Sequence, residues 1–151
     1  MKQLIKISLI TLLLLSVITY SAKGESLNRI IDGDTVVTHS GVKVRLYCID
    51  APEKRQLEGK LSKETLENLL KNKSFTIKSY SIDKYGRTIG ELYIDKESVI
   101  LQLVRIGQAV VYPQYCKEKE YYDAQQEAQK SKLGVWASPN FVMPWDFRKK
   151  K

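Results

Sequence analysis

Short runs of β-branched and alternating hydrophobic residues, separated by Gly, Pro and Asp, recur along the chain between positions 27 and 94. This pattern is typical of strands joined by tight turns. The predicted strands are residues 27–31, 35–38, 42–49, 74–79 and 88–94. His39-Ser40-Gly41 predicts a hairpin turn. Ala51-Pro52 ends the third strand, because proline cannot donate a hydrogen bond to a ladder.

Three segments instead show a helical period. Leucines spaced three to five residues apart predict an amphipathic helix that ends near Asn72; they are Leu57, Leu61, Leu66, Leu69 and Leu70. Further helices are predicted over 98–106, with Gly107 as its stop, and over about 119–132, before Gly134. Their inward-facing residues are Val99, Leu103 and Ile106 in the second helix and Tyr121, Ala124 and Ala128 in the third.

The order of these elements limits the fold class. Five short strands with a helix after the third are compatible with a small barrel of the OB type. We therefore expect an α+β, mainly β domain: a five-stranded OB-fold barrel with about three α-helices. The domain is expected to span residues 23–147, and residues 148–151 a solvated basic tail.

The amino-terminal residues differ from the rest. Lys2 and Lys6 precede an apolar run over 7–20, which is too short for a typical spanning helix and fits a secretory signal. We expect residues 1–22 to be a signal peptide, cleaved somewhere within 21–24, and the protein to be secreted or periplasmic. The alternative is an uncleaved segment that anchors the protein in a membrane.

Charge narrows the choice of partner. The chain holds 25 Lys and Arg against 17 Asp and Glu, a formal net charge of +8. Removal of the signal segment takes away two lysines and no acidic residue, so the basic character belongs to the domain. A polyanion is the natural partner. The single histidine, His39, excludes a His-rich zinc site and a pair of catalytic histidines.

The two cysteines, Cys48 and Cys116, allow two interpretations. An exported protein meets an oxidising compartment, in which the cysteines can form a disulfide. Alternatively, Cys48 is a small core residue in a strand and Cys116 is a thiol in a loop. The sequence leaves both interpretations open.

Acidic residues gather at the predicted strand ends, in Asp32-Gly-Asp34 and in Asp50-Ala-Pro-Glu53. Carboxylates without histidine or thiolate suit a hard cation, Ca²⁺ or Mg²⁺. Each segment alone also fits an ordinary turn. Arg45 lies between them and Arg87 closes a later turn, and planar guanidinium groups suit a phosphodiester. The combination favours a phosphodiester-cleaving site.

Five motifs carry a family resemblance: Ile31-Asp-Gly-Asp-Thr35, Arg45-Leu-Tyr-Cys-Ile-Asp-Ala-Pro-Glu53, Asp83-Lys-Tyr-Gly-Arg87, Leu103-Val-Arg-Ile-Gly107 and Gly134-Val-Trp136. In order and spacing they resemble the thermonuclease family, the staphylococcal nuclease-like proteins, over roughly residues 27–137. The resemblance implies an OB-fold, Ca²⁺-dependent nuclease that hydrolyses phosphodiester bonds of DNA and RNA with low sequence specificity.

The resemblance also implies roles for individual residues. Asp34 and Asp50, with the backbone carbonyl of Ala51, are expected to bind Ca²⁺, and Asp32 is expected beside the ion. Glu53 is expected to act as general base, with Arg45 and Arg87 binding and neutralising the phosphate. The substrate-binding positions are Lys84 and Tyr85, with Tyr112 and Tyr115 flanking the nucleotide. We expect a monomer with no stable protein partner.

The sequence allows two other interpretations besides a nuclease. One is a non-catalytic OB-fold module that binds nucleic acid, and the other is a basic surface-adhesion protein, for which charge alone suffices. Non-catalytic relatives usually lack acids or arginines of the site. Because Asp34, Arg45, Asp50, Glu53 and Arg87 are all present, catalysis is favoured.

Overall fold

A computed structural model of the chain describes residues 24–150. The expected signal segment, residues 1–22, lies outside the described residues. Within the described part, no helix has the length and apolar composition needed to cross a membrane.

His39 is an exposed turn residue, as expected, and its Nδ1 lies 3.1 Å from Ser26 Oγ.

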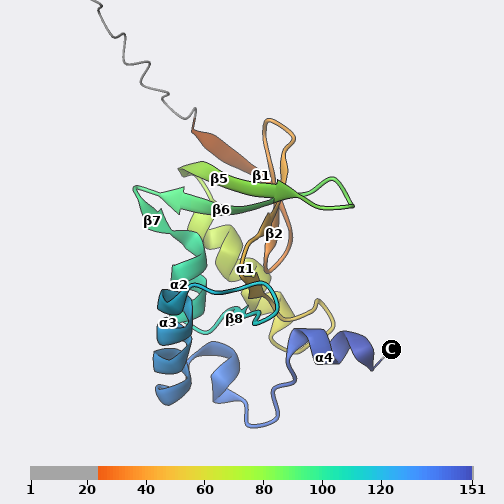
Figure 1. Cartoon of the computed structure of the whole chain (residues 1–151), viewed down its shortest axis with the longest axis vertical. Helices are drawn as coiled ribbons and strands as arrows, with labels where there is room; N and C mark the ends of the chain where they lie inside the picture. Colours follow the sequence, from red (N-terminus) through yellow and green to blue (C-terminus); the bar gives the residue numbers. More distant parts are fainter. Residues whose placement is uncertain (1–23, 151) are drawn as a thin grey trace, which may run out of the picture.

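The described residues form a β-sheet structure with helices packed at one side (Figure 1). The strands are β1 (Glu25–Asp32), β2 (Thr35–Thr38), β3 (Lys43–Leu46), β4 (Ile49–Asp50), β5 (Ser74–Ile82), β6 (Thr88–Ile94), β7 (Glu97–Ser98) and β8 (Val110–Val111). The helices are α1 (Gly59–Leu70), α2 (Val99–Arg105), α3 (Lys119–Lys130), the 3-10 helix η1 (Gly134–Ala137) and α4 (Pro144–Lys149).

The main sheet has the strand order β3-β2-β1-β5-β6-β7. Strand β3 also pairs in parallel with β6, so the run from β3 to β6 closes on itself. The remaining pairs are antiparallel, and β1–β2, β2–β3, β5–β6 and β6–β7 join through short turns, as hairpins do. This mainly β arrangement confirms the predicted OB-like fold class, with five principal strands where the sequence pattern predicts them.

The predicted third strand, residues 42–49, is wrong as a single element. It is two strands, β3 and β4, separated at Tyr47-Cys48. Cys48 has a φ of 69°, a left-handed conformation that cannot continue a strand. Strand β4 consequently leaves the main sheet and pairs with β8, Ile49 opposite Val111 and Asp50 opposite Val110. Asp50 thus belongs to a separate two-stranded sheet, yet its carboxylate stays in contact with Arg45 of β3, at 3.2 Å.

Helix α1 confirms the predicted leucine face in its second half, where Leu66 and Leu70 are buried, but not at Leu57 and Leu61. Its buried residues are Gly59, Ser62, Leu66 and Leu70. Leu57 precedes the helix and is 91% exposed, and Leu61 is 54% exposed. A Cβ atom on Gly59 would collide with the carbonyl oxygen of Glu53, so glycine lets α1 begin against the turn that carries Glu53.

Helices α2 and α3 follow the sequence pattern more closely. Val99 and Leu103 are buried in α2, but Ile106, predicted to face inward, lies after the helix and is 41% exposed. The predicted face of α3, Tyr121, Ala124 and Ala128, is buried. Helix α2 packs on α3 and on β6, which completes one core under the sheet.

Candidate active site

One cleft of about 990 Å³ brings the sequence-predicted site residues together. Those that line it are Asp32, Asp34, Arg45, Asp50, Ala51, Glu53, Lys84, Tyr85, Arg87, Tyr112 and Tyr115. They come from the β1–β2 turn, β3, β4, the β5–β6 turn and the loop after β8. The fold therefore converts five separate chain segments into one polar surface.

Two buried carboxylates form the floor of the cleft. Asp34 is 6% exposed in the β1–β2 turn, and Asp50 is 2% exposed in β4. Asp34 accepts hydrogen bonds from the Ala51 amide (2.8 Å) and from Thr35 Oγ1 (3.1 Å). Asp34 in turn donates its own amide to Asp32 Oδ1 at 3.3 Å. These contacts place Asp32, Asp34 and the Asp50-Ala51 segment side by side.

Arg45 links the two buried acids. Its Nε lies 3.2 Å from Asp34 Oδ1, and its terminal Nη2 lies 3.2 Å from Asp50 Oδ1. Nη1 donates to the carbonyl oxygens of Leu46 (2.6 Å) and Ile49 (2.9 Å). With a side chain only 15% exposed, Arg45 is held by the protein on all three nitrogens. It neutralises and aligns the carboxylates.

Burial and proximity alter the acidity of this group. Burial, followed by repulsion from Asp34, raises the pKa of Asp32 to about 6. Burial also raises the pKa of Asp50, although the hydrogen bonds from Arg148 and the charge of Arg45 oppose it. Carboxylates crowded out of water resist ionisation unless a cation compensates them. The floor of the cleft therefore gains from any further positive charge.

The donor set fits a hard divalent cation. Carboxylate and carbonyl oxygens are what Ca²⁺ and Mg²⁺ prefer, and Asp34, Asp50 and Ala51 supply them from adjacent turns. The described residues also bring Cys48, Cys116 and Glu118 together, but both sulfur atoms are joined in a disulfide and provide no thiolate ligand. The acidic floor is the candidate metal position.

Glu53 stands at the rim beside these acids, with 31% of its side chain exposed. Its backbone is fixed by Gln56, whose Oε1 accepts from the Glu53 amide (2.9 Å) and whose amide donates to the Glu53 carbonyl (2.8 Å). A partly solvated carboxylate on a fixed turn can accept a proton from water.

Arg87 lines the same cleft but is held apart from the acidic floor. Its Nε and Nη2 each lie 2.7 Å from Asp83 Oδ2, and its guanidinium lies 5.5 Å from the centroid of the Tyr85 ring. Lys84 lies 5.1 Å from the same centroid. Tyr85 is 70% exposed, so this turn presents two cations and an aromatic face to the open side of the cleft.

Tyr112 and Tyr115 form an aromatic wall of the cleft. The rings of Tyr112 and Tyr115 meet edge to face with centroids 5.0 Å apart. Trp145 of α4 stacks on Tyr112 with centroids 5.1 Å apart and an interplanar angle of 5°. Trp145 lies beyond Tyr115, the last site residue that the sequence predicted, so this contact was not foreseen.

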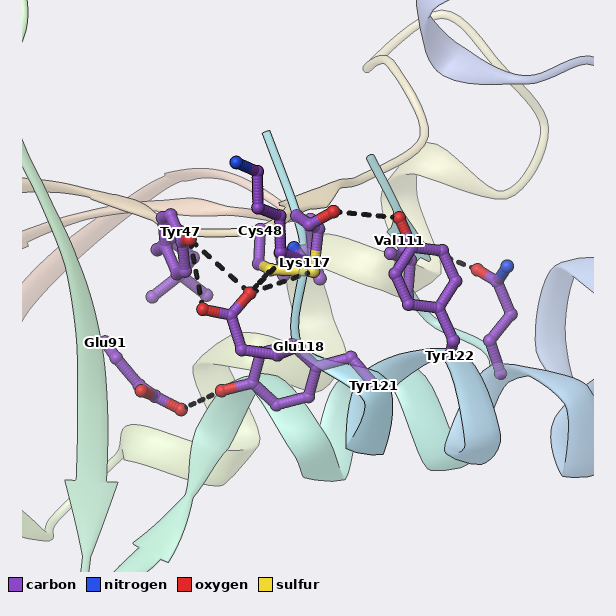
Figure 2. The surroundings of a disulfide bond; sticks show 12 residues. Tyr47, Cys48, Glu91, Val111, Lys117, Glu118, Tyr121 and Tyr122 are labelled. Atoms are coloured by element: carbon purple, nitrogen blue, oxygen red, sulfur yellow. Dashed lines mark hydrogen bonds between the residues drawn. A yellow bond between two sulfur atoms is a disulfide. The ribbon is translucent and has the colours of Figure 1, made fainter. Parts of the chain in front are cut away.

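A disulfide fixes the base of the aromatic wall. Cys48 and Cys116 are bonded, which settles the two interpretations left open by the sequence in favour of a bridge. The Glu118 carboxylate lies beside it and accepts from Tyr47 OH (3.1 Å) and from the Lys117 amide (2.9 Å), as Figure 2 shows. The bridge ties the turn before Asp50 to the loop that carries Tyr112 and Tyr115.

The carboxy terminus also departs from expectation. Arg148 belongs to α4 and pairs with Asp50 and Glu53, so the prediction of a solvated tail is wrong for this residue. These bonds, led by the one to Asp50, raise the pKa of Arg148. A local signal was present: Pro144 opens a helix, Asp146 lies in its first turn and basic residues lie in its last. The sequence holds no signal that Arg148 would pair with Asp50 and Glu53.

Comparison with known proteins agrees with this architecture. The family model described as "Staphylococcal nuclease homologue" matches residues 43–138. An "Uncharacterized endonuclease" of Haemophilus influenzae is 35% identical over 154 residues, covering 97% of this chain and 86% of the relative. An "Uncharacterized endonuclease" of Escherichia coli O157:H7 is 37% identical, covering 82% of this chain and 83% of the relative.

A third relative carries a more specific name. The "Micrococcal nuclease" of Shigella flexneri is 32% identical over 135 residues, covering 80% of this chain and 78% of the relative. Fold, cleft and relatives together define a nucleic-acid-hydrolysing enzyme. The chain belongs to the family of staphylococcal nuclease homologues.

Proposed function

We propose that this protein is an exported, calcium-dependent nuclease that hydrolyses phosphodiester bonds of DNA and RNA with low sequence specificity. The observation that carries the proposal is the convergence of Asp34, Asp50 and Glu53 with Arg45 and Arg87 on one cleft. Acids able to hold a cation, a base and phosphate-binding cations are what hydrolysis of a phosphodiester requires.

Asp34 and Asp50, with the carbonyl of Ala51, are the residues that would hold Ca²⁺. When bound, the ion would polarise the phosphate and neutralise part of its negative charge. Arg45 contacts one oxygen of each acid and so holds the two carboxylates beside each other. A rigid ligand pair of this kind lowers the cost of ordering the site.

Glu53 is proposed to take the proton of the attacking water. Its side chain is more exposed than those of Asp34 and Asp50, so water reaches it, and its backbone is fixed by Gln56. General-base assistance of this kind contributes roughly 10²- to 10⁴-fold in rate.

Arg87 is proposed to bind the phosphate as charge develops on its oxygens. Asp83 orients the guanidinium fork through two nitrogens, which leaves its remaining donors available to the cleft. Tyr85, Tyr112 and Tyr115 offer aromatic faces to bases, a contact that is tolerant of sequence. Low specificity follows, because phosphates and ring faces are common to every nucleotide.

Export is supported by two independent features. The amino-terminal sequence fits a secretory signal, and the Cys48–Cys116 bridge needs an oxidising compartment to persist. A site with two carboxylates is expected to bind Ca²⁺ weakly, with a dissociation constant of about 10⁻⁴–10⁻³ M, as extracellular modules do.

A digestion assay tests the proposal. The purified protein should degrade denatured DNA and RNA with Ca²⁺, stop in EGTA and resume when Ca²⁺ is restored. Glu53→Gln should lose about 10²-fold or more of the rate at unchanged folding. Glu64→Gln, on the exposed side of α1, is the matched control and should keep full activity. Binding of nucleic acid without cleavage would instead support the non-catalytic module.

A further inference from the structure

Arg148, in helix α4, reaches two acidic residues of the cleft. Its Nη1 lies 2.7 Å from Glu53 Oε1 and 3.2 Å from Asp50 Oδ1, and its Nη2 lies 2.8 Å from Asp50 Oδ2. One guanidinium thus bridges the proposed general base and a proposed metal ligand.

Three contacts hold α4 in this place. Pro144, its first residue, is buried. Trp145 stacks on Tyr112, and Gln56 Nε2 donates to the carbonyl oxygen of Val142 at 2.7 Å. The same Gln56 fixes the turn of Glu53. The helix that delivers Arg148 is therefore packed against the aromatic wall, and the segment before it is bonded to the residue that fixes Glu53.

The bonds of Arg148 use the oxygens that a cation would need. Asp50 Oδ1 already receives Arg45 Nη2 at 3.2 Å, and Asp50 Oδ2 receives Arg148. Asp50 is buried, so its charge requires a positive partner at all times. A divalent cation and Arg148 satisfy the same requirement at the same carboxylate.

We propose that Arg148 is a positioning residue that competes with the divalent cation for Asp50. This inference rests on the proposed function and adds to it an exchange of partners at Asp50, in which the cation replaces Arg148. In the metal-free protein the guanidinium neutralises Asp50 and holds Glu53. Cation binding at Asp50 releases Arg148 and leaves Glu53 free to accept a proton.

The test is direct titration of Ca²⁺ by isothermal calorimetry without nucleic acid. Arg148→Gln should bind Ca²⁺ about tenfold more tightly than wild type, because binding no longer breaks charge-assisted hydrogen bonds. Arg148→Lys, which keeps the charge but loses the fork, should fall between them. Lys149→Gln is the matched control, because it removes the same charge from the same helix. Lys149 pairs with Asp146, at 3.0 Å, and not with Asp50 or Glu53.

The sign of the change separates the proposal from a purely structural role. If Arg148 only shaped the cleft, Arg148→Gln would bind Ca²⁺ more weakly than Lys149→Gln, and equal or weaker binding overturns the proposal. Failure of every variant and of wild type to bind Ca²⁺ would overturn both this proposal and the calcium site. Binding by wild type and Lys149→Gln without a gain in Arg148→Gln or Arg148→Lys would overturn the exchange alone.

A thermal measurement gives a second readout. A ligand that binds only the folded state raises the melting temperature, and the rise grows with the logarithm of the ratio of ligand concentration to dissociation constant. Ca²⁺ is added at about 1 mM, which is near the dissociation constants of extracellular calcium modules. The melting temperature should then rise more for Arg148→Gln than for Lys149→Gln. An equal rise in the two variants would contradict the exchange.

Discussion

The indole of Trp145 lies parallel to the phenol ring of Tyr112, with ring centroids 5.1 Å apart. Trp145 comes from α4 and Tyr112 from the loop after β8, so the contact joins the carboxy-terminal helix to the aromatic wall of the cleft. Tyr112 in turn meets Tyr115 edge to face. The orientation of the proposed base-stacking surface depends on a residue of α4.

Replacing Trp145 should weaken binding of single-stranded nucleic acid. A stacked aromatic pair contributes about 0.5–1.5 kcal/mol, so Trp145→Ala should raise the dissociation constant roughly three- to tenfold. Fluorescence anisotropy with a labelled oligonucleotide measures this dissociation constant. The titration is done in EGTA, where we expect no cleavage. Trp145→Phe retains an aromatic ring and should lose less. Unchanged affinity in Trp145→Ala would show that Tyr112 is oriented without the stack.

Loss of the disulfide should lower stability strongly. The bridge joins positions separated by 68 residues, and closing such a loop stabilises the folded state by about 4 kcal/mol in the chain-entropy treatment. Cys48→Ser with Cys116→Ser should therefore unfold at a much lower urea concentration than wild type. Dithiothreitol should shift wild type toward the double variant and leave the double variant unchanged. A difference in unfolding free energy below roughly 1 kcal/mol would contradict this expectation.

The two arginines of the site should differ in their structural importance. Arg45 contacts both Asp34 and Asp50, so Arg45→Gln leaves two buried acids undercompensated. Removing one partner of a buried ion pair lowers the free energy of unfolding by about 3–5 kcal/mol, and we expect this loss in the metal-free protein. Arg87 pairs only with the partly exposed Asp83 among the acids, so Arg87→Gln should change stability by less than about 1 kcal/mol.

Urea denaturation in EGTA compares the two variants, and each serves as the control for the other. Steady-state kinetics adds the functional contrast, because Arg87→Gln should lose kcat with little change in KM if the fork acts in the transition state. Similar destabilisation by both substitutions would mean that the buried acids do not depend on Arg45.

Glu91, which does not line the cleft, should make the stability of the protein depend on pH. It is 2% exposed. Burial alone would raise its pKa, but hydroxyl groups of Ser98, Tyr121, Tyr93 and Tyr80 donate to it and lower the pKa below its ordinary value of 4.5. A depressed pKa means that protonation opposes folding. The stabilisation is fully present above about pH 4.5 and is lost as the pH falls through the lower, folded-state value.

Glu91→Gln removes the charge that these hydroxyl groups stabilise. It should cost about 2–3 kcal/mol at neutral pH and flatten the fall in stability below pH 4.5. Urea denaturation at a series of pH values measures both effects. Glu64→Gln, with a side chain 51% exposed, should leave the profile as in wild type. A Glu91→Gln profile as steep as that of wild type would assign the acid sensitivity to other carboxylates.

Local patterns in the sequence predicted much of this architecture. The five principal strands and the buried face of α3 follow from periodicity, because a buried face repeats its hydrophobic residues at the period of the element. The candidate acids and arginines were also identifiable, since Asp34 and Asp50 each stand in a short polar motif beside a strand. The start of helix α1 was less predictable, because Gly59 and Ser62 are buried there while Leu57 and Leu61 are exposed.

By itself, then, the sequence determined the approximate places of the five principal strands and the candidate residues of the site. Only the tertiary structure decided which of them meet. The left-handed turn at Cys48 redirects β4 to β8, and packing of α4 brings Arg148 to Asp50, 98 residues earlier in the chain. A local period reports burial of a face, whereas a pairing over that separation depends on how several packed elements close around a core. No local pattern encodes that distance.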